Sequence, residues 1–310
     1  MALPIRWRWK FERIVEQVKG FFGAGKQQPP RPRLCPSCGT LVGASASKCH
    51  QCGASMTYSL AAASRSLGGV FKSDAPVTYV ILLVTCAVFG FSLMATIRAA
   101  GEFAPPSGGL MGLFNLGAIS GQILVRLGES LPLGYNLRAP WRFIMAIFLH
   151  GSLLHIGFNM WVIMDVGPQI EELYGSARYL FIYVFTGACG YLVSSFFGHV
   201  SVGASGSLLG LIGVMLALTT GRHTASMQML RSQLIRWLIY IAIMGLMMSG
   251  IDNWAHAGGF AAGYLLGRVM VDRAPADANE RTRAYALGWL AGAAVVVSFA
   301  FMVMFYLRTK

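Results

Sequence analysis

Long apolar runs, separated by short polar or glycine-rich stretches, dominate the chain after residue 76. Runs of about twenty apolar residues are typical of helices that cross a bilayer. The pattern predicts seven spans, at residues 77–99, 143–166, 178–198, 203–220, 234–250, 252–271 and 284–307. We therefore expect an all-α polytopic membrane protein.

Composition and charge agree with this interpretation. The 310 residues are 55 % hydrophobic and only 12 % charged, whereas soluble domains average about 25 % charged residues. A net charge of +13 can indicate a nucleic-acid partner, but we expect none, because its distribution is explained by membrane topology. Eleven Lys and Arg against three acidic residues in 1–76 predict a cytoplasmic N-terminus under the positive-inside rule, and the arginine-rich loops after the fourth and sixth spans fit the same orientation.

The segment before the first span has three predicted parts. Residues 1–30 are basic and carry apolar residues three and four apart, which favours either a helix lying on an anionic membrane face or an ordinary cytoplasmic tail. Arginine and lysine interrupt any signal-peptide core there, so we expect the first span to act as an uncleaved signal anchor. A cysteine-containing module over 31–56 and a linker over 57–76 follow.

Four cysteines form two C-x-x-C-G turns separated by ten residues: Cys35, Cys38, Cys49 and Cys52. Such turns can close four thiolates around one tetrahedral zinc ion, so we expect a small zinc ribbon holding a structural Zn²⁺. Disulfides are the alternative, but the segment is predicted to be cytoplasmic, where thiols stay reduced. The module has no catalytic features and is expected to bind an unidentified partner.

Polar residues recur near the predicted outer ends of three spans. Ser205 begins the fourth span and His256 begins the sixth, while the second carries His150, His155 and Asn159. These three spans run in the same direction, so the five groups are expected to converge at one depth. Because polar groups are expensive inside a bilayer, they indicate a functional site.

The convergent groups fit nucleophilic catalysis. A histidine can take the proton of a serine hydroxyl and so activate it, which suits His256 and Ser205. Developing negative charge on the attacked oxygen needs preorganised donors, and the Ser205 amide, His155 and Asn159 could supply them. Asp252 lies one helical turn from His256 at the membrane edge, so we favour a dyad over a triad.

Each feature also has a simpler explanation. Small residues around Ser205 and the Gly259-x-x-x-Gly263 pair are common in helix packing surfaces. A single intramembrane histidine can be a packing residue or part of a proton path. Ser201 and Ser207 are other candidate hydroxyls near the same position.

In combination, the motifs resemble a known family. Residues 77–271 are similar to the six-span core of the rhomboid intramembrane serine proteases. The matching pieces are Trp141-Arg142, His150-x4-His155-x3-Asn159, Gly167-x3-Glu171-x3-Gly175-Ser176, Gly203-Ala204-Ser205-Gly206 and Ala255-His256-Ala257-Gly258-Gly259 with Gly263.

The resemblance implies specific roles. Ser205 would be the nucleophile, His256 the general base and acid, and His155 with Asn159 the lining of the oxyanion hole, with no cofactor for catalysis. Segment 100–142 would be a first loop half sunk in the outer leaflet, braced, like its neighbours, by Glu171 and Arg142. The chain departs from relatives at Leu209, where an aromatic residue is frequent, and in the added zinc module and C-terminal segment 272–310 with its seventh span.

The expected function is intramembrane serine endopeptidase activity on transmembrane protein substrates. We expect a bacterial plasma (inner) membrane location, an N-terminus in the cytoplasm and a site open to the outer side. A catalytically silent rhomboid-like binder of membrane clients is one alternative, although such proteins usually lack the Ser or the His. A proton-relay transporter is another, but it would call for acidic residues within the spans, where only Asp165 qualifies.

Overall fold

The computed structural model describes residues 32–35, 40–44, 46–53, 55–56, 75–100, 116–247, 250–270 and 273–309. The predicted amphipathic segment 1–30, Cys38, almost all of the linker and the first part of the loop after the first span lie outside these residues. The chain divides into two compact units, Met1–Ser59 and Leu60–Lys310. Each unit is described by itself.

The first unit contains a short β-hairpin. Strand β1 (Arg33–Leu34) pairs antiparallel with β2 (Leu41–Val42), and Arg33 lies opposite Val42. A bridge between Lys48 and Ser55 follows. The buried residues form a very small cluster, Cys35, Val42, Cys49 and Met56. A core of this size needs an additional constraint such as a metal to be stable.

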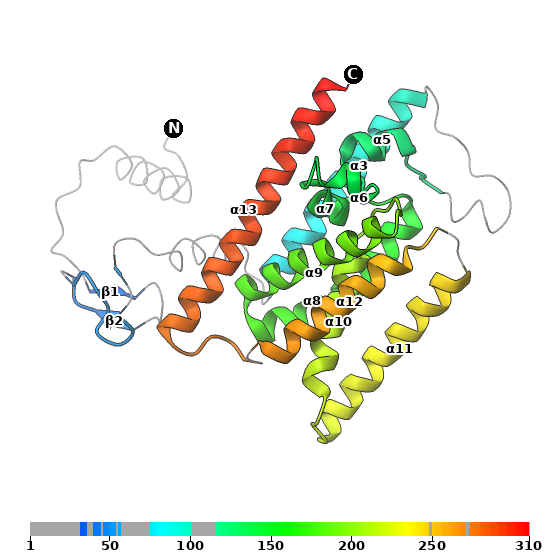
Figure 1. The fold of residues 1–310 in the computed structure, drawn as a ribbon. Coiled ribbons are helices and arrows are strands. Elements are labelled where there is room, and N and C mark those ends of the chain that lie inside the picture. Colours follow the sequence, from blue (N-terminus) through cyan, green and yellow to red (C-terminus); the bar gives the residue numbers. More distant parts are fainter. Residues whose placement is uncertain are drawn as a thin grey trace, which may run out of the picture. The chain divides into compact units, whose positions relative to one another are not determined.

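The second unit is helical (Figure 1). Each of the seven predicted apolar runs contains a helix: α3 (Pro76–Ala100), α8 (Leu153–Tyr174), α9 (Ser176–Phe196), α10 (Ser205–Thr219), α11 (Ala225–Met247), α12 (Asn253–Val269) and α13 (Ala278–Arg308). Between α3 and α8 lie α5 (Gly121–Leu127), α6 (Leu133–Asn136), α7 (Arg142–Met145) and a 3-10 turn, η1 (Ala146–Phe148). The described part of the second unit thus has the all-α architecture that the sequence predicts for the membrane core.

Length and apolarity alone identify fewer crossings than seven. Among the described residues, α3, α9, α11 and α13 are long and apolar enough to span a membrane, and α7 with η1 and α8 makes a fifth if the bent pair is one span. Helix α10 has 15 residues and α12 has 17, fewer than the roughly 20 of an ordinary span. The seven crossings therefore remain a prediction.

The predicted second span, residues 143–166, is wrong at both ends. Residues Arg142–Phe148 form a separate short segment, bent by 91° from α8. Helix α8 starts at Leu153 because the side chain of Ser152 caps it, accepting from the backbone N–H of His155. It continues through Pro168 to Tyr174 and ends at Gly175, which has a φ of 80°. Its last two turns, which contain Glu171 and Glu172, lie beyond the predicted end of the span at residue 166.

Glu171 explains why these polar turns stay helical. Its buried carboxylate accepts hydrogen bonds from the backbone N–H groups of Val77 and Thr78 at 2.9 and 2.8 Å, and from the hydroxyls of Thr78 and Ser176 at 2.8 and 2.6 Å. One side chain thereby caps the start of α3 and ties it to the junction of α8 and α9. The contacts agree with the bracing role expected for Glu171.

Replacing Glu171 by alanine should destabilise the protein by about 3 kcal/mol or more, because buried donors would lose their charged acceptor. Glu172 is exposed in the same turn and supplies a matched control, whose Glu172→Ala variant should stay within about 0.5 kcal/mol of the parent. Thermal unfolding in detergent would compare the two. Equal unfolding temperatures would contradict the bracing role.

Helices α10 and α12 pack against each other through backbone. A Cβ atom built at Gly259 or Gly263 would overlap the carbonyl oxygens of Gly206 and Gly210, respectively. Further along the pair, Gly213 leaves no room for a side chain against the backbone of α12. Close approach of two helices is the usual role of such small residues in membranes, and here it brings the N-terminal ends of α10 and α12 together.

Candidate active site

Ser205 and His256 meet at the N-terminal ends of α10 and α12. Ser205 is the first residue of α10, and its Oγ lies 2.8 Å from Nε2 of His256. Both side chains are half-buried. This is hydrogen-bond distance for a nucleophile and its base. The sequence predicted that the two residues would converge, and the structure brings them into contact.

The other two candidate hydroxyls lie elsewhere. The Ser207 Oγ is buried without a hydrogen-bond partner among the described residues and lies against Gly187 of α9. The Ser201 backbone pairs with Ser130 through two hydrogen bonds of 3.0 Å. Of the three serines, Ser205 is the one hydrogen-bonded to a histidine.

The turn before Ser205 is held by several contacts. Gly203 adopts a φ of 131°, which favours glycine. Its N–H donates to the carbonyl of Ala146 at 2.9 Å, and its own carbonyl accepts from the Tyr191 hydroxyl at 2.5 Å. The Ala204 N–H donates to Nε2 of His150 at 3.4 Å. These bonds fix the direction in which Ser205 leaves the turn.

His155 borders the same turn. Its Nδ1 accepts from the Gly151 N–H at 3.4 Å, which leaves the ring proton on Nε2 in the neutral form. A Cβ atom at Gly203 would lie 2.7 Å from that Nε2 and 3.8 Å from the Ser205 Oγ. The imidazole therefore lies on the Ser205 side of α8 with a donor facing the turn.

Asn159 lies one helical turn beyond His155. Its Nδ2 donates to the His155 carbonyl at 2.8 Å, while its Oδ1 is buried without a partner among the described residues. The second Nδ2 proton remains for another acceptor. His155 and Asn159 thus share a helix face as predicted, with His155 adjacent to the Ser205 turn.

Asp252 caps α12, the helix that carries His256. Its Oδ1 accepts from the N–H groups of Trp254 and Ala255 at 3.0 Å each, capping α12, and its Oδ2 accepts from the Ser194 hydroxyl of α9. Among the described residues, no hydrogen bond joins this carboxylate to the imidazole of His256. Asp252 thus positions His256 through the helix that carries it.

Three contributors were not assigned roles from sequence. Tyr191 holds Gly203, Ser194 anchors the Asp252 cap, and His150 receives the Ala204 amide. His150 was recognised as one of the converging polar groups. Nothing in the local sequence distinguishes Tyr191 or Ser194 from ordinary residues of an apolar span, because their partners, Gly203 and Asp252, lie outside α9.

The loop after α5 closes this end of the bundle. The Arg142 guanidinium donates to the carbonyls of Val125 and Glu129 at 2.9 Å each, so its bonds are those of a structural brace. Burial raises the pKa of the Glu129 carboxyl from 4.5 to about 7, against the opposing effect of the Arg142 charge. The loop thus contains an acid that titrates near neutral pH.

Glu129 predicts a loss of stability toward alkaline pH. A carboxyl whose pKa is higher in the folded state binds its proton more tightly there, so the resulting stabilisation is complete below about 4.5 and is lost as pH rises through about 7. Glu129→Gln should flatten this decline in the unfolding temperature between pH 5 and 8. An unchanged slope in the variant would contradict the assignment.

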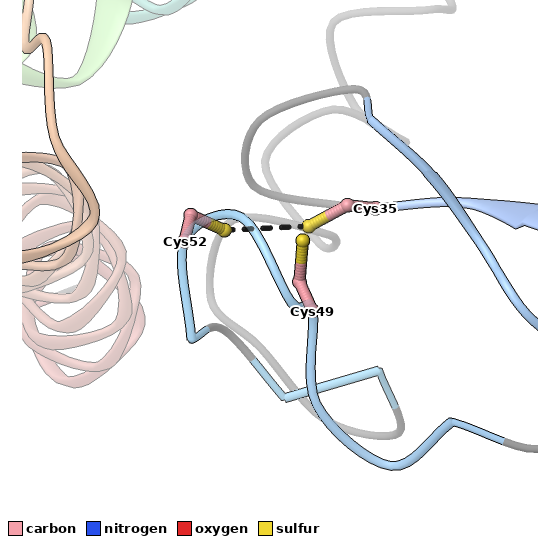
Figure 2. A group of neighbouring side chains, drawn as sticks. All are labelled: Cys35, Cys49 and Cys52. Carbon is pink, nitrogen blue, oxygen red and sulfur yellow. Dashed lines mark hydrogen bonds between the residues drawn. The ribbon is translucent and has the colours of Figure 1, made fainter.

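Three cysteines of the first unit gather at one point (Figure 2). The sulfur atoms of Cys35, Cys49 and Cys52 all lie within 4.8 Å of one another, and the Cys35 and Cys52 sulfurs are 3.6 Å apart. Around a tetrahedral zinc, Zn–S bonds of about 2.3 Å imply sulfur separations of about 3.8 Å. The three sulfur positions fit one metal ion, and Cys38 lies outside the described residues.

Comparisons with known proteins agree with this architecture. The model of the Rhomboid domain matches residues 137–273, which include Ser205 and His256. RHOMBOID-like protein 5 of Arabidopsis thaliana is 33 % identical over 66 % of this chain and 72 % of its own length. The putative rhomboid protease YdcA of Bacillus subtilis is 33 % identical over 45 % of this chain and 74 % of its own length.

These matches, together with the helical core, define the class as integral multi-pass membrane proteins of the rhomboid type. The chain belongs to the rhomboid family. The match covers a smaller share of the length of some other relatives: 34 % of RHOMBOID-like protein 4 of Arabidopsis thaliana and 25 % of the rhomboid protease GluP of Bacillus subtilis.

Proposed function

We propose that the protein is a serine endopeptidase that cleaves membrane proteins within or beside their spanning segments. The observation that carries the proposal is the 2.8 Å hydrogen bond between the Ser205 Oγ and the His256 Nε2. Family membership supports it, because relatives such as GluP are named rhomboid proteases. A catalytically silent binder is less well supported, since both members of the pair are present and in contact.

The proposed reaction has two halves. His256 takes the Ser205 proton as the Ser205 Oγ attacks the substrate carbonyl carbon, which gives a tetrahedral oxyanion. Collapse breaks the C–N bond, and His256 gives its proton to the leaving amine. Water then attacks the acyl-enzyme with His256 again as base, and release of the acid restores Ser205.

Stabilisation of the oxyanion is assigned to groups beside Ser205. The Ser205 N–H lies at the start of α10, where the helix leaves its first amides unpaired and its dipole favours negative charge. His155 contributes the Nε2 proton that faces the turn, and Asn159 the free proton of its amide. Preorganised donors of this kind are worth about 3 kcal/mol each at the transition state.

Substrate is proposed to reach the site sideways from lipid, between α8 and α11. In the most apolar stretch of α11, 22 % is buried inside the protein, against 56 % in the corresponding stretch of α9. Asp165 of α8 links the two helices by accepting from Gln233 Nε2 at 3.0 Å and from Trp237 Nε1 at 2.9 Å. Separation of α8 and α11 requires these bonds to break.

Loosening this link should speed cleavage of helical substrates. Asp165→Ala removes two hydrogen bonds to a charged acceptor, and a loss of about 1.4 kcal/mol would shift the opening equilibrium about tenfold. Trp237→Phe keeps most of the ring packing against Phe158 and Trp161 but removes one donor, so its effect should be smaller. Rates would be compared for a single-span substrate and a short soluble peptide, and equal acceleration of both would contradict gating at α8 and α11.

The proposed activity is tested by reconstituting the full chain in liposomes with a single-span protein that contains helix-weakening glycine and alanine. Cleavage by the parent and none by Ser205→Ala would support a serine protease. Binding of the substrate without cleavage by either protein would instead favour the silent binder. The proposed setting is a bacterial plasma membrane, with the N-terminus in the cytoplasm and the dyad toward the outer side.

For the first unit we propose a structural zinc site formed by Cys35, Cys38, Cys49 and Cys52, which holds the module in shape for an unidentified partner. Three converging thiols support it, and a metal would provide the stability that the small core lacks. Elemental analysis of the purified full chain should give one zinc per protein, and Cys35→Ser with Cys49→Ser should lose it. A parent protein without zinc would refute the site.

A further inference from the structure

A cleft between α3, α5 and α13 is not used by the proposed reaction. It has a volume of about 280 Å³ and is lined by Phe91, Met94, Ala95, Arg98, Ala99, Ile123, Arg126 and Tyr306. Figure 1 shows α5 and the C-terminal end of α13 at the same end of the helical unit. Two of the three helices, α3 and α13, are long and apolar enough to cross the membrane, so the cleft lies beside spans.

The lining combines an apolar wall with two cations. Six of the eight residues are apolar or aromatic, and Phe91 and Met94 are 47 % and 56 % exposed. Arg98 lies in the last turn of α3, and Arg126 in the last turn of α5. An apolar surface with two positive charges near the end of a span suits an amphiphile with an anionic headgroup.

Neither arginine is neutralised within the described residues. Arg98 is exposed and has no hydrogen-bond or ion-pair partner there. Arg126 donates from Nε to the Thr309 hydroxyl at 3.2 Å and from Nη2 to the Tyr306 carbonyl at 3.1 Å, but it meets no carboxylate. Cations in a last turn also offset the helix dipole, yet that role needs no shared cleft.

Arg126 is also held in place. Its guanidinium carbon lies 4.4 Å from the Tyr306 ring centre, and Tyr306 packs edge-on against Phe91 at 5.5 Å. The remaining terminal nitrogen, Nη1, has no partner among the described residues. A fixed guanidinium with free donors is well suited to phosphate oxygens.

We propose that this cleft binds an anionic phospholipid, with the headgroup phosphate between Arg98 and Arg126 and an acyl chain along Phe91 and Met94. The volume is at the lower end for small-molecule pockets, so it accommodates the phosphate and the adjoining part of one chain. The rest of the lipid stays in the bilayer. The site is formed by α3, α5 and α13, and the proposal holds whether or not the protein is a protease.

The test measures lipid binding to the detergent-solubilised full chain by native mass spectrometry. Phosphatidylglycerol should remain bound in preference to phosphatidylcholine. Arg98→Gln should weaken phosphatidylglycerol about fivefold or more, as loss of a charged hydrogen bond to phosphate implies, whereas Arg98→Lys should keep most of the affinity. Arg98 has no internal partner, so its removal is not expected to unfold the protein.

Arg268→Gln is the matched control, because Arg268 is also exposed in the last turn of a helix, α12, but lines no part of this cleft. Ala99→Glu, which adds negative charge to the cleft wall, should weaken binding as much as Arg98→Gln. Equal retention of both lipids, or equal loss in the Arg268 and Arg98 variants, would overturn the proposal. Displacement of the lipid by inorganic phosphate alone would also overturn it, because the site would then take free anions.

Discussion

Ser205→Ala and His256→Ala are each expected to lower the rate of substrate cleavage by about 10⁴-fold or more, and the double variant is expected to be no slower than the slower single one. The reason is the direct contact between the Ser205 Oγ and the His256 Nε2 at 2.8 Å. Nucleophile and base act as one unit, so their effects on the rate are strongly non-additive. Single-turnover cleavage in liposomes would measure the three rates.

Ser207→Ala supplies the matched control. It removes an identical hydroxyl from the same helix, two residues away, but that hydroxyl is buried and has no hydrogen-bond partner among the described residues. Loss of an unsatisfied polar group is nearly neutral or stabilising, so activity should stay within about twofold of the parent. Additive losses in the Ser205 and His256 variants would mean that the two residues do not form a dyad.

Gly259→Ala and Gly263→Ala should each destabilise the helical unit by about 3 kcal/mol or more. Overpacking a well-filled core typically costs about 1–3 kcal/mol, and here the obstructing atoms are the carbonyl oxygens of Gly206 and Gly210. Backbone of a helix cannot move aside as a flexible side chain can. Thermal unfolding in detergent would measure the loss, and activity should fall with it because the dyad spans the α10 and α12 pair.

Gly90→Ala tests whether this effect is steric. Gly90 is also inside an apolar helix, α3, but a Cβ atom there would meet nothing within 4 Å. Alanine is the better helix former by about 0.5–1 kcal/mol, so the variant should be as stable as the parent or slightly more so. If it were destabilised as much as Gly259→Ala, helix composition rather than close packing would be responsible.

The sequence predicts helices and convergent chemistry well for one physical reason. A span must be apolar throughout its length, so each run from 77–99 to 284–307 reveals a helix. Polar residues then stand out within these runs, as Ser205 and His256 do. The parallel direction of alternate spans places their N-terminal ends at one depth, and the structure brings the two side chains together.

The same criteria fail where polarity is satisfied by distant partners. The predicted span ends at residue 166, but α8 continues past Glu171, whose carboxylate is hydrogen-bonded to α3 and Ser176. The break before Leu153 depends on the Ser152 cap and falls at His150-Gly151-Ser152, where the apolar residues on both sides predict a single span. Tyr191 gives no sequence signal because its acceptor, the Gly203 carbonyl, belongs to another element. The number of crossings is hard to predict because α10 and α12 are short.

The central claim, that Ser205 is a nucleophile activated by His256, is tested most directly by covalent labelling. A fluorophosphonate reacts with an activated serine hydroxyl, so the full chain in detergent would be treated with one and the labelled residue located by peptide mass spectrometry. We predict one adduct, on Ser205, that is lost in His256→Ala and retained in Ser207→Ala. Labelling of Ser201 or Ser207, or equal labelling of Ser205 without His256, would contradict the account.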